Sequence, residues 1–116
     1  MIKINETNVT IMVADMDKAI IFYESIGLTI KNRWGNHYAM LVTSGITLGI
    51  HPKDEKTSTT SGTVSIGFMI DDIKEAKILL DKNKINCTSE DDGKSGIYLH
   101  FKDLDGTILY FVQPKW

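Results

Sequence analysis

Hydrophobic and polar residues follow the same order in two successive stretches of the chain. In each stretch a short alternating run comes first, followed by apolar residues at helical spacing and then by three more β-rich runs. Alternation with a period of two is typical of half-buried strands, and spacing of three to four residues is typical of a helix lying on a sheet. The pattern predicts an α+β fold built from two tandem β-α-β-β-β modules.

The first module has clear signals for where its helix begins and ends. Asp15 precedes Met16 at the position of a helix N-cap, where a carboxylate accepts bonds from the first-turn N–H groups. Gly27 is expected to end the helix, with Leu28 as the apolar residue that follows a C-terminal glycine. Strands are expected at 9–13, 28–34, 37–43 and 46–51, with hairpin turns at 35–36 and 44–45.

The second module repeats these signals, and Asp71 and Asp72 are interpreted as helix-capping residues. Strands are expected at 63–70, 85–89, 96–102 and 107–113, with a helix at 73–83. A polar stretch at 89–96 is expected to form a loop near the pocket of this module. The chain is interpreted as one domain, 1–116, with module one at about 6–52, an exposed linker at about 53–62 and module two at about 63–114.

The two modules also match residue by residue. At an offset of 57, residues 8–28 align with 65–85 without a gap, and a second match at an offset of 61 aligns 45–50 with 106–111. Such internal repeats indicate tandem copies of one structural unit. Paired half-folds usually build a pocket from equivalent positions, so both modules are expected to line one site.

Composition excludes several classes of partner. A net charge of −2 gives no broad attraction for nucleic acid or for an anionic membrane surface. No apolar run reaches membrane-spanning length, and residues 1–6 lack the apolar stretch of a signal peptide. The single cysteine, Cys87, cannot form an internal disulfide, which fits a reducing compartment. We expect a cytoplasmic protein that binds neither nucleic acid nor membrane.

Three motifs resemble those of one family. Residues 13–23 read VADMDKAIIFY, residues 70–73 read IDDI, and residues 101–114 read FKDLDGTILYFVQP. With the duplicated module, they resemble the vicinal oxygen chelate superfamily of glyoxalases, fosfomycin and bleomycin resistance proteins, and extradiol dioxygenases. The resemblance implies a cupped mixed sheet with helices on its convex face, a ligand pocket on its concave face and a homodimer.

The resemblance also implies where a metal would be held. Carried over to this chain, the ligand positions of metal-dependent members fall on Asn8, Gly49, Ser65 and Tyr110. None of them is a histidine or a carboxylate, the donors that Zn²⁺, Mn²⁺ or Ni²⁺ needs. We therefore expect no metal and no cofactor at these positions.

The three histidines, His37, His51 and His100, are expected on the cavity face. Their spacing matches no local metal-ligand motif, so polar lining is the favoured interpretation and a three-histidine metal site the alternative. His100, near Tyr98 and Tyr110, is the candidate catalytic base. The residues expected to bind a ligand are Asn8, Met12, Arg33, Trp34, His37, Gly49, His51, Ser65, Tyr98, His100 and Tyr110.

Two other features have a functional and a plainer interpretation. Arg33 and Trp34 could clamp an anionic or aromatic ligand, or could be a solvated arginine beside an interface tryptophan. Asp103 and Asp105 could be an acid/base pair, but Asp-Gly before a strand is typical of a hairpin turn, and the turn is favoured.

Two classes of function remain. The first is metal-free binding of a small molecule, similar to the bleomycin resistance branch, in a cavity lined by aromatic and polar side chains. The alternative is a lyase, isomerase or thiol transferase of the same superfamily acting on a small carbonyl or epoxide compound. A regulatory module without a ligand is a third possibility.

Overall fold

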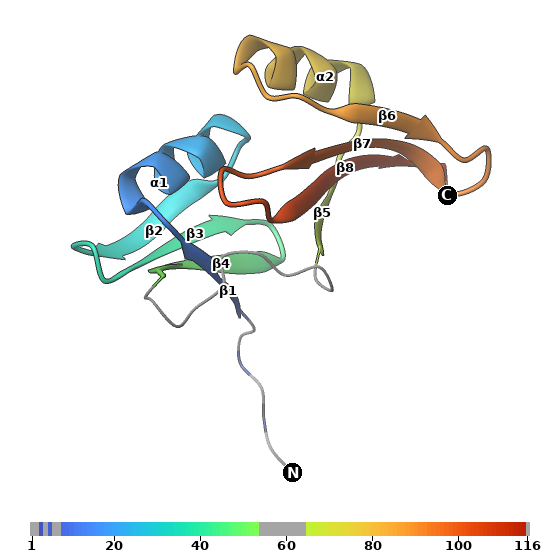
Figure 1. Cartoon of the computed structure of the whole chain (residues 1–116). Helices are drawn as coiled ribbons and strands as arrows, with labels where there is room; N and C mark the ends of the chain where they lie inside the picture. The colour runs from blue at the N-terminus through green and yellow to red at the C-terminus, as the bar shows by residue number, and fades with distance from the viewer. Residues whose placement is uncertain (1–2, 4, 6–7, 54–64, 116) are drawn as a thin grey trace. The chain divides into compact units, whose positions relative to one another are not determined.

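The computed structural model describes residues 3, 5, 8–53 and 65–115. Apart from residue 53, the expected linker at 53–62 lies outside the described residues, as do residues 63 and 64 of the expected strand. The chain divides into two compact units, Met1–Thr59 and Thr60–Trp116. Each unit contains the expected β-α-β-β-β order and is described by itself (Figure 1).

The first unit is a four-stranded sheet with one helix. Its elements are β1 (Asn8–Val13), α1 (Met16–Ser25), β2 (Thr29–Trp34), β3 (Tyr38–Thr43) and β4 (Ile46–Pro52). The strand order is β1-β4-β3-β2, in which β1 and β4 run parallel and the other neighbours run antiparallel.

The second unit repeats this topology. Its elements are β5 (Ser65–Met69), α2 (Ile73–Lys82), β6 (Thr88–Asp91), β7 (Gly96–Lys102) and β8 (Ile108–Pro114). The order β5-β8-β7-β6 again has one parallel pair, β5 with β8. The predicted α+β fold with a repeated module is confirmed as two four-stranded mixed sheets, each with its own helix.

Both helices begin at the aspartates predicted to cap them. The Asp15 carboxylate accepts a bond of 3.0 Å from the Lys18 backbone N–H, and the Asp72 carboxylate accepts one of 2.9 Å from that of Lys74. In the second unit, the Gln113 side-chain oxygen on β8 also accepts from the Ile73 N–H at 2.9 Å. These bonds satisfy N–H groups that a helix leaves without an internal partner.

Both helices also end in the same way. The Leu28 N–H donates to the Tyr23 carbonyl at 3.0 Å, and the Ile85 N–H donates to the Leu80 carbonyl at 2.9 Å. The residue before each of these apolar residues has a left-handed backbone: Gly27 with φ +114° and Lys84 with φ 58°. The predicted stop at Gly27 is confirmed, and its equivalent in the second unit is a lysine.

Each core lies between the helix and one face of its sheet. Alternate strand residues on that face are buried together with the inner residues of the helix, as the period-two pattern predicts. In the first unit the fully buried side chains include Tyr23, Leu41, Leu48 and Ile50, and in the second they include Leu80 and Leu109. The opposite face of each sheet therefore carries no helix of its own unit (Figure 1).

Three local expectations need correction. His37 lies in a three-residue turn rather than on a strand, because its N–H donates to the Trp34 carbonyl at 2.9 Å and Trp34 then pairs with Tyr38. The strand expected at 85–89 is β6, Thr88–Asp91, so the loop expected at 89–96 is shorter and spans residues 92–95. All four β6 residues are exposed, because an edge strand needs only backbone pairing with one neighbour.

The turn interpretation of the acidic pair is confirmed. The Asp103 carboxylate accepts bonds from the backbone N–H groups of Asp105 at 2.9 Å and Thr107 at 2.8 Å. Gly106 follows with φ +86°, a backbone conformation that glycine adopts without strain. Within the described residues, the structure contains no helix long and apolar enough to span a membrane.

Candidate functional site

Three rings meet on the helix-free face of the second sheet. Tyr98 and His100 project from β7 and Tyr110 from β8, and their ring centroids lie 5.7 to 6.0 Å apart. The rings of Tyr98 and His100 are nearly parallel, with 7° between their planes. We call these three side chains the ring cluster. It brings together three of the residues predicted to bind a ligand.

Gly67 on β5 makes room for this arrangement. It is the register partner of Tyr110, whose ring lies across it, and a Cβ atom at residue 67 would overlap the phenol ring. Any other residue at this position would displace Tyr110 from the ring cluster. The glycine therefore fixes where the ring of Tyr110 lies.

The edge strand β6 adds a carboxylate to the ring cluster. Glu90 is the register partner of Tyr98, and its Oε1 atom lies 3.4 Å from Nε2 of His100. The side chains of His100 and Glu90 are 41% and 62% exposed, respectively. The pair is therefore accessible to a ligand, and solvent screens its electrostatic contribution to stability.

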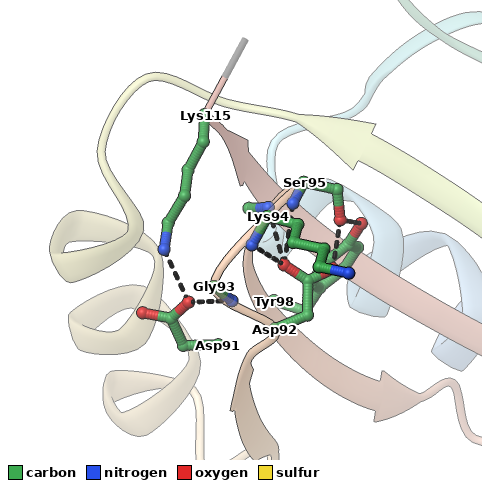
Figure 2. Close-up of polar contacts among 8 residues, drawn as sticks. Asp91, Asp92, Gly93, Lys94, Ser95, Tyr98 and Lys115 are labelled. Carbon is green, nitrogen blue, oxygen red and sulfur yellow. Dashed lines mark hydrogen bonds and ion pairs between the residues drawn. The ribbon is translucent and has the colours of Figure 1, made fainter.

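The hairpin between β6 and β7 connects to the ring cluster through hydroxyl groups (Figure 2). The Asp92 carboxylate accepts bonds from the backbone N–H groups of Lys94 at 2.9 Å, Ser95 at 2.8 Å and Gly96 at 3.2 Å, and from the Ser95 hydroxyl. The Ser95 hydroxyl lies 2.9 Å from the Tyr98 hydroxyl. These bonds, led by that of the Ser95 hydroxyl, lower the pKa of Asp92 well below its ordinary value.

A second carboxylate closes the same hairpin. Asp91 accepts bonds from Nζ of Lys115 at 2.7 Å and from the Gly93 N–H at 2.9 Å (Figure 2). The Lys115 bond is the largest cause of a pKa of Asp91 below its ordinary value. The hairpin is thus anchored by two ionised carboxylates.

The first sheet carries a corresponding group of aromatic residues on its helix-free face. The Tyr38 ring lies 5.8 Å from that of Trp34 and 6.5 Å from that of His51, measured between centroids. The Tyr38 hydroxyl is 3.2 Å from the Thr10 hydroxyl on β1 and lies over Gly49. A Cβ atom at residue 49 would overlap the Tyr38 hydroxyl, so here too a glycine admits a tyrosine.

Register shows that Tyr38 and Tyr98 are equivalent. Met40 pairs with Gly49 in the first sheet and His100 pairs with Tyr110 in the second, so the third strands correspond at an offset of 60. Tyr38 was not among the residues predicted to bind a ligand. The repeat contained the signal, because Tyr38 aligns with Tyr98 once the third strands are compared at this offset.

The positions that would hold the family's metal do not fit one. Gly49 offers no donor, and Tyr38 occupies the space in which a side chain at residue 49 would lie. Tyr110 offers a neutral phenol within the ring cluster, and Asn8 and Ser65 are exposed side chains without charge. Among the described residues, no group of three or more His, Cys, Asp and Glu side chains is placed to hold a metal ion.

Arg33 lies on the opposite face of the first sheet from Trp34. It pairs with Ala39, whereas Trp34 pairs with Tyr38, so consecutive side chains point to opposite faces of the sheet. The Arg33 guanidinium bonds to the Asp17 carboxylate of α1 at 2.6 Å, to the Asn36 side chain and to a backbone carbonyl of the turn. Arg33 and Trp34 therefore do not face one ligand together, as the clamp interpretation expected. The Arg33 guanidinium instead bonds to α1 and to the turn after β2.

The remaining predicted residues of the first unit lie at the ends of its strands. His51, near the end of β4, has Nδ1 2.7 Å from the Pro52 carbonyl, which can only accept, so Nδ1 carries a proton. Met12 is half-buried and is the register partner of His51. His37 lies in the turn, exposed.

Comparison with known proteins agrees with the fold. A family model, the Glyoxalase/Bleomycin resistance protein/Dioxygenase superfamily, matches residues 3–111. A search of curated proteins gave no match. Among solved structures, the antibiotic binding protein TnmS3 from a Streptomyces species has a TM-score of 0.78 and 20% identity, with 99% of each chain covered.

Two resistance proteins have similar structures. The fosfomycin resistance protein FosX from Listeria monocytogenes has a TM-score of 0.80 and 18% identity, covering 99% of this chain and 94% of its own. The bleomycin resistance determinant encoded on the transposon Tn5 has a TM-score of 0.75 and 20% identity, covering 97% and 100%. At these identities the likeness concerns the fold. Because the family model spans nearly the whole sequence, the chain belongs to the Glyoxalase/Bleomycin resistance protein/Dioxygenase superfamily.

Proposed function

We propose that this protein binds a small organic molecule without a metal ion, on the helix-free faces of its two sheets. One observation carries the proposal: at the two metal positions at the centres of the sheets, tyrosine rings take the place of metal ligands. Tyr38 covers Gly49 in the first unit, and Tyr110 lies across Gly67 in the second. A phenol is a poor ligand for Zn²⁺ or Ni²⁺, but its ring and hydroxyl are good partners for an organic ligand.

The chemistry of these faces supports binding. Aromatic side chains supply a large contact area at a low cost in conformational entropy, and a few hydroxyl groups orient the ligand. The first unit offers Trp34, Tyr38 and the Thr10 hydroxyl, and the second offers the ring cluster. We infer that Asn8, Met12 and His51 lie at the margin of the ligand surface of the first unit and Ser65 at that of the second, and that the protein is a homodimer. TnmS3 and the two resistance proteins share the fold, which makes sequestration or resistance the biological role we favour.

Calorimetry tests the proposal against the metal-dependent alternative. Purified protein is titrated with Zn²⁺, Mn²⁺ and Ni²⁺ and, separately, with a panel of aromatic antibiotics. We expect no stoichiometric metal binding and saturable binding of at least one organic compound. Tyr38→Ala should weaken that binding by about tenfold, since truncation of a buried aromatic contact costs on the order of 1–2 kcal/mol. The matched control is Tyr23→Phe, in the core of the first unit.

Stoichiometric uptake of one metal ion per site would contradict the proposal. So would a Tyr38→Ala variant that binds every compound as tightly as the unmodified protein does.

An enzyme of the same superfamily is the second candidate function, and the contact between His100 and Glu90 favours it. A carboxylate that contacts one imidazole nitrogen can orient the ring, which is an arrangement suited to a general base. Tyr98 and Tyr110 beside it could donate hydrogen bonds to a small carbonyl or epoxide substrate.

Substitution of His100 distinguishes the two functions. If His100 is the base, His100→Ala should reduce turnover at least a hundredfold while ligand affinity changes little. If it only lines the site, affinity should fall a few-fold and no turnover should be lost. The measurement is turnover of carbonyl and epoxide substrates beside calorimetric affinity, with His37→Ala, in the exposed turn, as the matched control.

A further inference from the structure

The hydrogen bonds that link the hairpin to the ring cluster have a defined direction. The Asp92 carboxylate can only accept, so the Ser95 hydroxyl donates its single hydrogen to Oδ2 of Asp92. Ser95 then has no hydrogen for Tyr98, and the Tyr98 hydroxyl must be the donor in the 2.9 Å bond between them. The chain therefore runs from Tyr98 through Ser95 to Asp92 (Figure 2).

This direction determines what Tyr98 can offer a ligand. Its one hydroxyl hydrogen is committed to Ser95, so the phenol oxygen presents only lone pairs to a bound molecule. Asp92 is held in its ionised form by three backbone N–H groups and the Ser95 hydroxyl. A donor chain that ends on an anion polarises each bond in it, which adds negative charge to the phenol. The Tyr98 ring face is therefore suited to a cation.

The neighbours of Tyr98 add to this preference. His100 and Tyr110 extend the aromatic surface, and the Glu90 carboxylate, which is 62% exposed, lies at its edge. Lys102 shares the face of β7, two residues beyond His100 and roughly 7 Å from it along the strand. Glu90 is nevertheless the charged group in contact with the cluster, through its bond to His100.

The ring cluster is also held in place before any ligand arrives. Gly67 receives the Tyr110 ring, and the hairpin holds the Tyr98 hydroxyl through Ser95. A pre-organised surface loses little conformational entropy on binding a flat ligand. A flexible or bulky ligand would gain less from it.

We propose that the ring cluster, together with Glu90, selects a planar aromatic cation that carries N–H donors. The rings stack on the planar system, the Tyr98 oxygen and the Glu90 carboxylate accept from the N–H groups, and the negative charge favours the cation. This inference rests on the proposed function, and it names the class of ligand that the second unit of the protein accepts.

Paired dyes test the charge preference. Proflavine is a planar three-ring cation with amino groups, and anthracene-2-carboxylate is an anion of the same shape. Fluorescence titration of the unmodified chain should give at least tenfold tighter binding of proflavine. Glu90→Gln should reduce that preference about fivefold, and Ser95→Ala, which frees the Tyr98 hydrogen, should reduce it about threefold. Ser89→Ala, an exposed serine of β6 on the opposite face, is the matched control and should change nothing.

Equal affinity for the two dyes, a preference for the anion, or no binding of either dye would overturn this inference. A preference that survives both Glu90→Gln and Ser95→Ala would also overturn it. Glu90 is exposed, so its variant is expected to fold even if that of Ser95 does not. The proposed function fails separately, through stoichiometric metal uptake or the absence of binding by any organic compound.

Discussion

Lys84 shows how one residue can keep a structural position after its chemistry has changed. It aligns with Gly27 at an offset of 57, and both residues have a left-handed backbone after a helix. A side chain with a Cβ atom is strained in this conformation by about 1–2 kcal/mol. The second unit has the same helix end because the bond from the Ile85 N–H to the Leu80 carbonyl requires it.

Lys84→Gly should therefore stabilise the protein. We expect a gain of about 0.5–1 kcal/mol, after the greater freedom of glycine in the unfolded chain is subtracted, and an increase in Tm of roughly 2–4 °C. The increase in Tm is measured by thermal unfolding monitored with circular dichroism. Lys77→Gly, inside α2, is the matched control and should lower stability by about 1 kcal/mol. A Lys84→Gly variant less stable than the original chain would refute the strain argument.

At the scale of elements, the hairpin between β6 and β7 is stabilised by ionised carboxylates. Because Asp92 has a lower pKa in the folded chain than in the unfolded chain, its contribution to stability is present above the unfolded value. That contribution is lost as the pH falls through the folded value. The hairpin should therefore weaken only in acid.

Ser95→Ala should raise the pKa of Asp92 toward its ordinary value of about 3.9, because the largest cause of the lowering is the bond from the Ser95 hydroxyl. Carbon-13 NMR of the side-chain carboxyl groups, followed from neutral pH into acid, measures the pKa of Asp92 in the unmodified chain and in the Ser95→Ala variant. The pKa of Asp91, which Lys115 lowers, should not change and serves as the internal control. An Asp92 that titrates identically with and without Ser95 would contradict the assigned bond.

At the scale of the whole molecule, the proposed homodimer is the feature to test. Each sheet ends in edge strands, and Trp34 at the end of β2 is 51% exposed. Such edges and exposed aromatic side chains are commonly covered by a partner. Size-exclusion chromatography with light scattering should give about 26 kDa, twice the 13.0 kDa of one chain. A mass of one chain at high micromolar concentration would contradict the dimer.

The elements were predictable from the sequence because their signals are local. Alternation, the caps at Asp15 and Asp72 and the stop at Gly27 each act within a few residues. The internal repeat predicts the same order of elements in both halves of the chain, so each half supports the prediction for the other. Errors arose where pairing with a neighbour decides the outcome. The polar residues of β6 carry no strand pattern of their own, and His37 falls in a turn because Trp34 pairs with Tyr38.

The sequence by itself determined the α+β modules and the family resemblance, because residue identity and spacing are enough for each. Only the tertiary structure decided which side chains meet. It placed Glu90 beside His100, turned Arg33 toward α1 and seated Tyr38 over Gly49. Those contacts depend on strand register and on the space that a glycine leaves between strands distant in sequence, which no local pattern encodes.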